Sequence, residues 1–215
     1  MTGKSDHLFD VIAEHSLALA AKKLGCTLIN NSVFGNIITK AQRTLLRGID
    51  KGLTCDVGII ESGGNDCDYD WALVSSAPGA PHKPRVELPD FIRVLHEMIA
   101  TLRAHRITPL LMTMPPLVPE RWYKTITAGH NEAHIRAFLG GDRFRPYINH
   151  ERYSLAIMYC ARELNVQLVD MRKALLEAPD YRQLMCTDGI HPNEAGHQYL
   201  AAVWERELPL VRKEF

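Results

Sequence analysis

Asp188 and His191 are the residues whose types and spacing most directly suggest chemistry. They stand three positions apart in the segment TDGIHPN, residues 187–193. On a loop, this spacing lets a carboxylate accept a hydrogen bond from imidazole Nδ1, which fixes the tautomer and leaves Nε2 to act as a base. Each residue also has a plainer interpretation, because Asp188 could cap a helix and His191 could be a surface histidine.

Two further polar clusters carry groups that could bind a developing negative charge. They are NNSVFGN, residues 30–36, and GGND, residues 63–66. A glycine lets backbone N–H groups come close to a ligand, and an asparagine can donate its side-chain amide. Alone, the glycine pair is typical of a turn, and Asn65 is typical of a cap.

The elements predicted before these clusters indicate where the clusters lie in the fold. Short apolar runs predict buried strands at residues 26–30, 56–62, 107–114 and 166–171. Helices are predicted at about 6–24, 36–52, 151–164 and 193–208. Another helix is predicted around Phe91, Val94, Leu95, Met98, Ile99 and Leu102, which recur on one helical face.

Alternation of strands and helices predicts an α/β fold, with a parallel sheet covered by helices on both faces. Ligands bind such sheets at the carboxyl ends of the strands, which is where the three clusters fall. Residues 117–149 are less regular, and we expect a lid-like insertion around a short helix. The simplest organisation is one domain spanning residues 1–215.

The three clusters together resemble the SGNH hydrolases. GGND matches the G-x-N-D block of that superfamily, DGIHPN matches its D-x-x-H block, and NNSVFGN matches the block whose glycine follows the second strand. The residues in and around these motifs are similar to those of a bacterial branch of GDSL-like lipases and acylhydrolases. The resemblance runs from about Lys22 to the C-terminal helix. The resemblance implies a three-layer, flavodoxin-like fold.

The resemblance also implies roles for the matching residues. Gly35, through its backbone N–H, and Asn65, through its side chain, would form an oxyanion hole. His191 would be the general base and then the general acid, and Asp188 would orient it. The implied reaction is hydrolysis of a small-molecule ester through an acyl-serine intermediate, with no cofactor and no metal.

The nucleophilic serine of that family is missing from this sequence. Its block is G-D-S on the turn after the first strand, and no G-D-S occurs in the chain. Ser5 is an early serine, but without a preceding strand it is more typical of a helix cap. Thr2 would need to act as an N-terminal nucleophile, and Ser62 is more typical of a hydroxyl packed in the sheet.

Two explanations remain open for the missing block. Either a strand and a G-D-S turn lie upstream of Met1, or the protein is a non-catalytic, ligand-binding relative that kept the pocket. The fold implied by the resemblance places the first strand between the second and third. Its loss would leave two inner edges with unpaired N–H and C=O groups, so we favour the first explanation.

The composition of the chain argues against some classes of binding partner. The 25 basic and 25 acidic residues balance, so no net field favours nucleic acid or an anionic membrane. No apolar run reaches the roughly 18 residues of a membrane span. The N-terminal residues lack the order of a signal peptide, so a cytoplasmic location is expected. Five cysteines without a C-x-x-C pair predict reduced thiols.

The sequence gives weaker support to a metal site or a nucleotide site. A metal site built from Asp66, Asp188, His191 and His197 lacks the spacing of known ligand motifs. Neither G-x-G-x-x-G nor a P-loop is present, which argues against a nucleotide. Asp66 is expected to brace the GGND turn. Other residues that could line or cover a pocket are Cys67, Asp68, Asp70, Trp71, Trp122, Tyr123 and His130. The sequence determines neither the ester nor the oligomeric state.

Overall fold

The computed structural model describes residues 14–215 and contains a parallel sheet in the order β1-β2-β3. The strands are β1 (Val57–Ile60), β2 (Thr108–Met112) and β3 (Gln167–Val169). Val57 pairs with Thr108, and Leu110 pairs with Gln167. These strands lie within three of the predicted apolar runs. The predicted α/β class with a parallel sheet is therefore confirmed.

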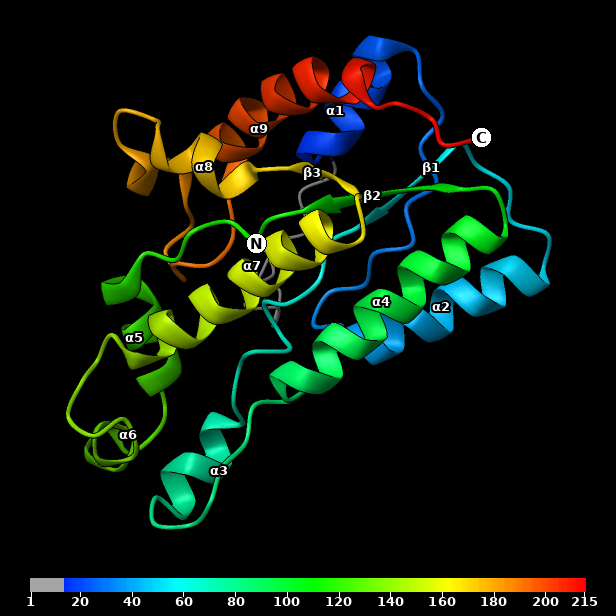
Figure 1. Ribbon diagram of the computed structural model, residues 1–215. Coiled ribbons are helices and arrows are strands. Elements are labelled where there is room, and N and C mark those ends of the chain that lie inside the picture. The colour runs from blue at the N-terminus through cyan, green and yellow to red at the C-terminus, as the bar shows by residue number, and fades with distance from the viewer. Residues whose placement is uncertain (1–13) are drawn as a thin grey trace, which may run out of the picture.

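Helices cover both faces of the sheet, and each face has its own hydrophobic core (Figure 1). On one face lie α1 (Ser16–Leu24), α8 (Met171–Leu176) and α9 (Glu194–Glu207). The other face is covered by α2 (Ile38–Asp50), α4 (Leu88–Ala104) and α7 (Arg145–Glu163). This arrangement gives the three layers that the resemblance implied.

Helix α4 shows why the apolar period predicts a helix well. All six residues of its predicted apolar face are buried: Phe91, Val94, Leu95, Met98, Ile99 and Leu102. They pack against the sheet and against α7 in one cluster. Pro89 stands in the first turn of this helix, where the missing N–H costs nothing.

The segment 117–149 is more regular than predicted. It contains α5 (Pro119–Thr127), α6 (Glu132–Phe138) and the start of α7 at Arg145. Together with α3 (Trp71–Ser76), which the sequence did not predict, these helices bury a small third core. The prediction of one short helix was wrong because short helices show fewer than three turns of apolar period.

The prediction of a strand at residues 26–30 was also wrong. Cys26–Asn30 form no ladder, and Ile29 is 52% exposed. An apolar run becomes a strand only when a neighbour pairs with it, and no described residue does so here. Of the predicted helix at 6–24, the described part begins at Ser16 and ends where Gly25 takes a left-handed conformation with φ of 67°.

Two short 3-10 helices, η1 (Tyr181–Leu184) and η2 (Leu208–Leu210), flank α9. No helix within residues 14–215 is both long and apolar enough to cross a bilayer.

Candidate active site

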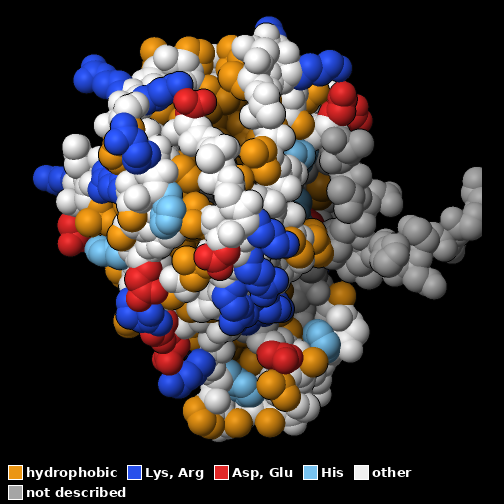
Figure 2. Space-filling view, turned by 90° about the vertical axis from the view of Figure 1, so that its right-hand side faces the viewer, with side chains coloured by type: hydrophobic (Ala, Val, Ile, Leu, Met, Phe, Trp, Pro, Cys, Tyr) orange, Lys and Arg blue, Asp and Glu red, His pale blue; other side chains and the backbone are white. Residues whose placement is uncertain are grey.

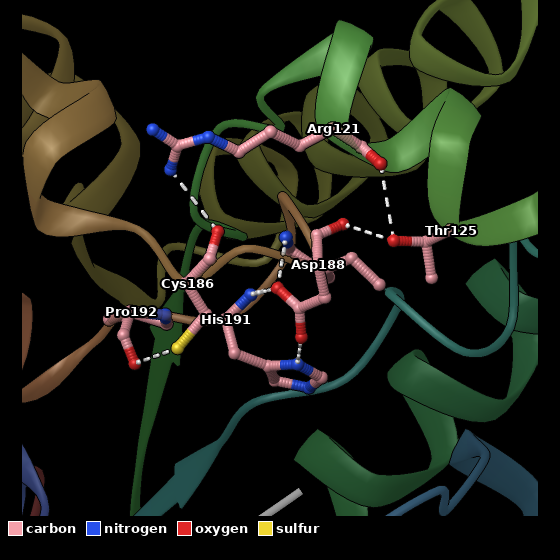
Figure 3. A network of polar contacts seen from close by, with 7 residues as sticks. Arg121, Thr125, Cys186, Asp188, His191 and Pro192 are labelled. Atoms are coloured by element: carbon pink, nitrogen blue, oxygen red, sulfur yellow. Dashed lines mark hydrogen bonds and ion pairs between the residues drawn. The ribbon is translucent and has the colours of Figure 1, made fainter. Parts of the chain in front are cut away.

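The turn between η1 and α9 holds Asp188 and His191 in direct contact (Figure 3). His191 Nδ1 lies 2.7 Å from Asp188 Oδ2. The other carboxylate oxygen, Oδ1, accepts the backbone N–H groups of Ile190 at 2.9 Å and His191 at 3.1 Å. The carboxylate is therefore fixed by its own turn before it orients the imidazole, and the ring is held with Nδ1 as its donor.

The charge state of Asp188 follows from these contacts. Its side chain is only 7% exposed, and burial alone would raise its pKa. The hydrogen bonds from the His191 ring and from the two backbone N–H groups outweigh burial and lower the pKa below its ordinary value. Asp188 is thus a carboxylate at neutral pH, as an orienting partner of histidine must be.

Gly189 allows the turn to pack directly on α5. Its φ is +78°, and a Cβ at this position would lie 2.7 Å from Trp122 N and from Val118 O. The Gly189 carbonyl also accepts the Val118 N–H at 2.8 Å. Only glycine combines this backbone conformation with so close an approach.

Helix α5 supports the same turn with side chains that sequence reasoning missed. Thr125 Oγ1 donates to the Asp188 carbonyl at 3.0 Å, and Arg121 Nη1 donates to the Cys186 carbonyl at 3.2 Å. Figure 3 shows both residues reaching the turn from one side of α5. No motif marks Arg121 or Thr125, because their partners are backbone carbonyls about 60 residues away.

The GGND segment forms the second part of the site, and Asp66 organises it. This fully buried carboxylate accepts the Gly63 N–H through Oδ2 at 3.0 Å and the Ile38 N–H through Oδ1 at 2.8 Å. Asp66 therefore joins the turn after β1 to the first residue of α2, and it braces the turn as expected. Gly63, with φ of +125°, lies against Met114.

Asn65 and Gly35 line the same open cavity as His191. The Asn65 side-chain amide has no hydrogen-bond partner within residues 14–215, so its donors are available to a ligand. Gly35 takes a left-handed conformation with φ of +71°, and a Cβ at this position would meet no atom within 4 Å. Beside it, the Phe34 ring lies 5.4 Å from the His191 ring.

Glu61 is a further residue of this cavity, and no motif in the sequence marks it. It follows β1 directly and lines the cavity near His191. Water reaches Glu61 through the open cavity, yet the protein surrounding its carboxyl raises the pKa, and the charge of His191 acts in the opposite direction. Its place near the end of the strand predicted at residues 56–62 was the one available signal.

The remaining predicted residues divide into several groups. Ser5 and Thr2 lie outside the described residues. Ser62 lines the cavity, as do Cys67, Asp68, Trp71 and Trp122, whereas Asp70 caps α3. The pocket lining does not include Tyr123 or His130. The five cysteines are free. Within residues 14–215, no three His, Cys, Asp or Glu side chains cluster closely enough to hold a metal ion.

Solved structures with similar folds come from several bacteria. A lipase/acylhydrolase from Enterococcus faecalis matches with a TM-score of 0.65 and 17% identity, covering 93% of this chain and 88% of that one. A mutant acetyl-xylooligosaccharide esterase from Geobacillus stearothermophilus matches with a TM-score of 0.64 and 20% identity, covering 91% and 81%. At these identities the likeness establishes the fold.

A third similar structure is a member of the lipolytic G-D-S-L family from Veillonella parvula. Its TM-score is 0.63 at 13% identity, with 95% of this chain and 93% of that chain covered. Comparison with curated protein sequences gave no match. The sequence model of the GDSL-like lipase/acylhydrolase family, however, matches residues 14–199. This match spans most of the chain and both motif-bearing turns, so the chain belongs to the GDSL-like lipase/acylhydrolase family.

Proposed function

We propose that this protein hydrolyses a small-molecule ester by acyl transfer to water. The observation that carries the proposal is the Asp188–His191 contact of 2.7 Å, made by a carboxylate that its own turn holds ionised. This pair shares a cavity with Asn65 and Gly35. Acyl transfer requires a fixed base and hydrogen-bond donors that face the same cavity.

In the proposed reaction, His191 Nε2 takes the proton from a nucleophilic hydroxyl as that oxygen attacks the ester carbonyl. The Asn65 amide and the Gly35 N–H stabilise the oxyanion of the tetrahedral intermediate. His191 then returns the proton to the departing alcohol. A water molecule, deprotonated by the same ring, then attacks the acyl-enzyme, and the ring returns that proton to the nucleophilic oxygen as the acid leaves. Asp188 keeps the imidazole oriented and stabilises its positive charge.

The nucleophilic hydroxyl belongs, in this proposal, to polypeptide outside residues 14–215. Ser5 is within the chain but outside the described residues, and no G-D-S block precedes it. The same absence supports the alternative, a ligand-binding protein that kept the base and the oxyanion hole without a nucleophile. That alternative predicts binding of an ester in the cavity without turnover.

Hydrolysis of 4-nitrophenyl acetate tests the proposal. We expect His191→Ala to abolish turnover and Asn65→Ala to lower kcat about a hundredfold or more, since one oxyanion donor contributes roughly 3 kcal/mol. His105→Ala is the matched control, because His105 lies before the amino end of β2, at the opposite edge of the sheet. Equal turnover in the parent protein and His191→Ala would contradict the proposal, and so would a loss below fivefold in Asn65→Ala.

A further inference from the structure

The outer face of α7 exposes apolar side chains that no other described element covers. The inner face of this helix packs against α4 and the sheet. On the opposite face, Leu155 and Tyr159 are 47% and 66% exposed. They stand four residues apart, so they lie one turn apart on the same face and form an apolar stripe. Figure 1 shows α7 running across the front of the molecule.

A groove between α7 and α8 lies beside this apolar stripe. Leu155 and Met158 of α7 and Leu176 of α8 line the groove, and all three side chains are partly exposed. Its volume is about 330 Å³, at the lower end of the range for small-ligand pockets, about 300–1,000 Å³. A groove of this size with apolar walls accommodates one aromatic side chain, the usual anchor of a protein interface.

Charged residues of both signs flank the apolar stripe. Arg152 and Glu163 lie on one side of it, because eleven residues are close to three full turns of helix. By the same spacing, Glu151 and Arg162 lie on the other side. Glu151 forms an ion pair with Arg172, whereas Arg152, Arg162 and Glu163 form none within residues 14–215. Each side of the stripe therefore carries one acid and one base, eleven residues apart.

This order of charges is complementary to itself. When two copies of a helix pack antiparallel about a two-fold axis, residues equally far before and after the axis face each other, and each side meets the same side of the other copy. With the axis at Ile157, Leu155 faces Tyr159 of the second copy. Arg152 stands five residues before the axis and Glu163 six after it. Their heights differ by one residue, about 1.5 Å.

The other side of the stripe matches in the same way. Glu151 stands six residues before the axis and Arg162 five after it. One axis position thus brings apolar residues together and places opposite charges together on both sides. Because the axis is two-fold, each of these contacts is made twice.

We propose that the outer face of α7 is the interface of a homodimer, packed antiparallel about a two-fold axis near Ile157. Tyr159 of each copy lies against Leu155 and the neighbouring groove of the other. Ion pairs between Arg152 and Glu163 border the apolar contact on one side. This inference is independent of the proposed function, because the outer face of α7 carries no residue of the candidate active site.

Helix α2 shows why an exposed apolar residue by itself does not indicate a second copy. It exposes Leu46 at 42%. Of its exposed charged residues, however, Lys40, Arg43 and Arg47 are basic, and Asp50 is acidic. Figure 2 shows Lys and Arg side chains gathered near the centre of the side on which α2 lies. Two copies meeting there would bring like charges together, which opposes association.

Sedimentation velocity of the purified 215-residue protein tests the dimer. Interfaces below about 1,200 Å² are weak, and one helix from each copy makes a small interface, so the measurement covers about 1–500 μM protein. We expect a monomer at the low end of this range and a dimer at the high end. Leu155→Ser should raise the dissociation constant at least tenfold. Leu46→Ser is the matched control and should leave it unchanged.

A charge exchange tests the antiparallel arrangement. Arg152→Glu and Glu163→Arg each place like charges opposite one another at two symmetric positions, so each should raise the dissociation constant at least tenfold. The double variant Arg152→Glu/Glu163→Arg restores opposite charges and should restore the parent value. Arg43→Glu on α2 is the control for an exposed charge reversal and should not weaken the dimer. Circular dichroism checks that every variant is folded.

Three results would overturn the proposal. The first is a parent protein that stays monomeric over the whole concentration range. The second is a dimer that Leu155→Ser and Arg152→Glu leave intact, because the copies would then meet through another surface. The third is a double variant that is folded but no better at dimerising than its single variants, since Arg152 and Glu163 would then not face each other.

Discussion

At the scale of single residues, the site depends on how one carboxylate is held. Asp188 has three donors for two oxygens, and two of them are N–H groups of its own turn. This arrangement costs little ordering entropy, because all the partners lie within three residues. It also keeps the carboxylate ionised despite its burial. A histidine supported in this way has one defined tautomer and can serve as a base.

Replacing Asp188 tests that support without changing the shape of the side chain. In Asp188→Asn, an amide N–H can face Nδ1, which favours the wrong imidazole tautomer. We expect kcat to fall at least a hundredfold and the ring ¹⁵N shifts of His191 to move, as NMR can measure. Unchanged shifts would contradict the orienting role.

The same substitution has a consequence for stability. Because the folded-state pKa of Asp188 is lowered, its ionised form stabilises the fold at pH values above the unfolded pKa, near 4. That contribution is lost as the pH falls through the lower folded-state value. Urea unfolding should show Asp188→Asn less stable than the parent at pH 7, with the two converging in acid. A constant difference would exclude the carboxylate charge as the cause.

The pKa of Asp68 is shifted in the opposite direction to that of Asp188, so we expect the opposite dependence of stability on pH. Burial raises its pKa to about 6, against the opposing hydrogen bond from Trp71 and the charge of Arg85. Between about pH 4 and 6 the folded protein keeps a proton that the unfolded chain has released, so stability falls as the pH rises. Asp68→Asn should remove this loss and gain up to about 3 kcal/mol on the parent by pH 7. Parallel urea profiles from pH 4 to 7 would contradict the prediction.

At the scale of elements, α5 supports the turn that holds Asp188 and His191. Thr125 and Arg121 donate to carbonyls of the turn, and Gly189 lies against the first turn of the helix. Helix α5 belongs to residues 117–149, which were predicted to form a lid-like insertion, and it packs against the turn at residues 186–189. Its position is fixed further by the small core that it shares with α3 and α6.

A pair of threonines on α5 tests this support. Thr125→Val removes the donor to Asp188 O, whereas Thr127→Val removes hydrogen bonds made within α5 itself. One hydrogen bond contributes about 1 kcal/mol, so we expect Thr125→Val to lower kcat roughly threefold to tenfold with KM unchanged. Thr127→Val should keep the parent kcat. Equal effects in the two variants would indicate a general loss of helix stability instead.

Gly189 supplies a second test at this scale. Gly189→Ala places a Cβ on a left-handed backbone and 2.7 Å from backbone atoms of Trp122 and Val118. We therefore expect the free energy of unfolding to fall by about 2 kcal/mol or more. Gly79→Ala is the control, since open space surrounds that residue, and its effect should stay within about 0.5 kcal/mol. Thermal unfolding of both variants measures the difference.

At the scale of the whole molecule, the sheet is narrower than its helical layers. Helices α1 and α2 lie beyond β1 on either face, and residues of both helices and of β1 line the cavity. The exposed apolar side chains of residues 26–36 lie along that cavity.

The sequence alone determined the features that depend on local pattern. The spacing of Asp188 and His191 predicted their contact, because three residues of loop leave few other arrangements. The face of α4 and the positions of β1, β2 and β3 followed from apolar period and run length, which record burial directly. The motifs GGND and DGIHPN likewise indicated the family, because both turns need particular residues at fixed positions.

Only the tertiary structure decided features that depend on distant partners. Residues 26–30 have the composition of a strand but form none, because a strand requires a neighbour that supplies hydrogen bonds. Arg121 and Thr125 carry no motif, since they bind backbone carbonyls about 60 residues away, and Glu61 gains its environment from a cavity formed by several elements. The apolar pattern of a sequence predicts whether a residue is buried, whereas the packing of the folded chain decides which residues contact it.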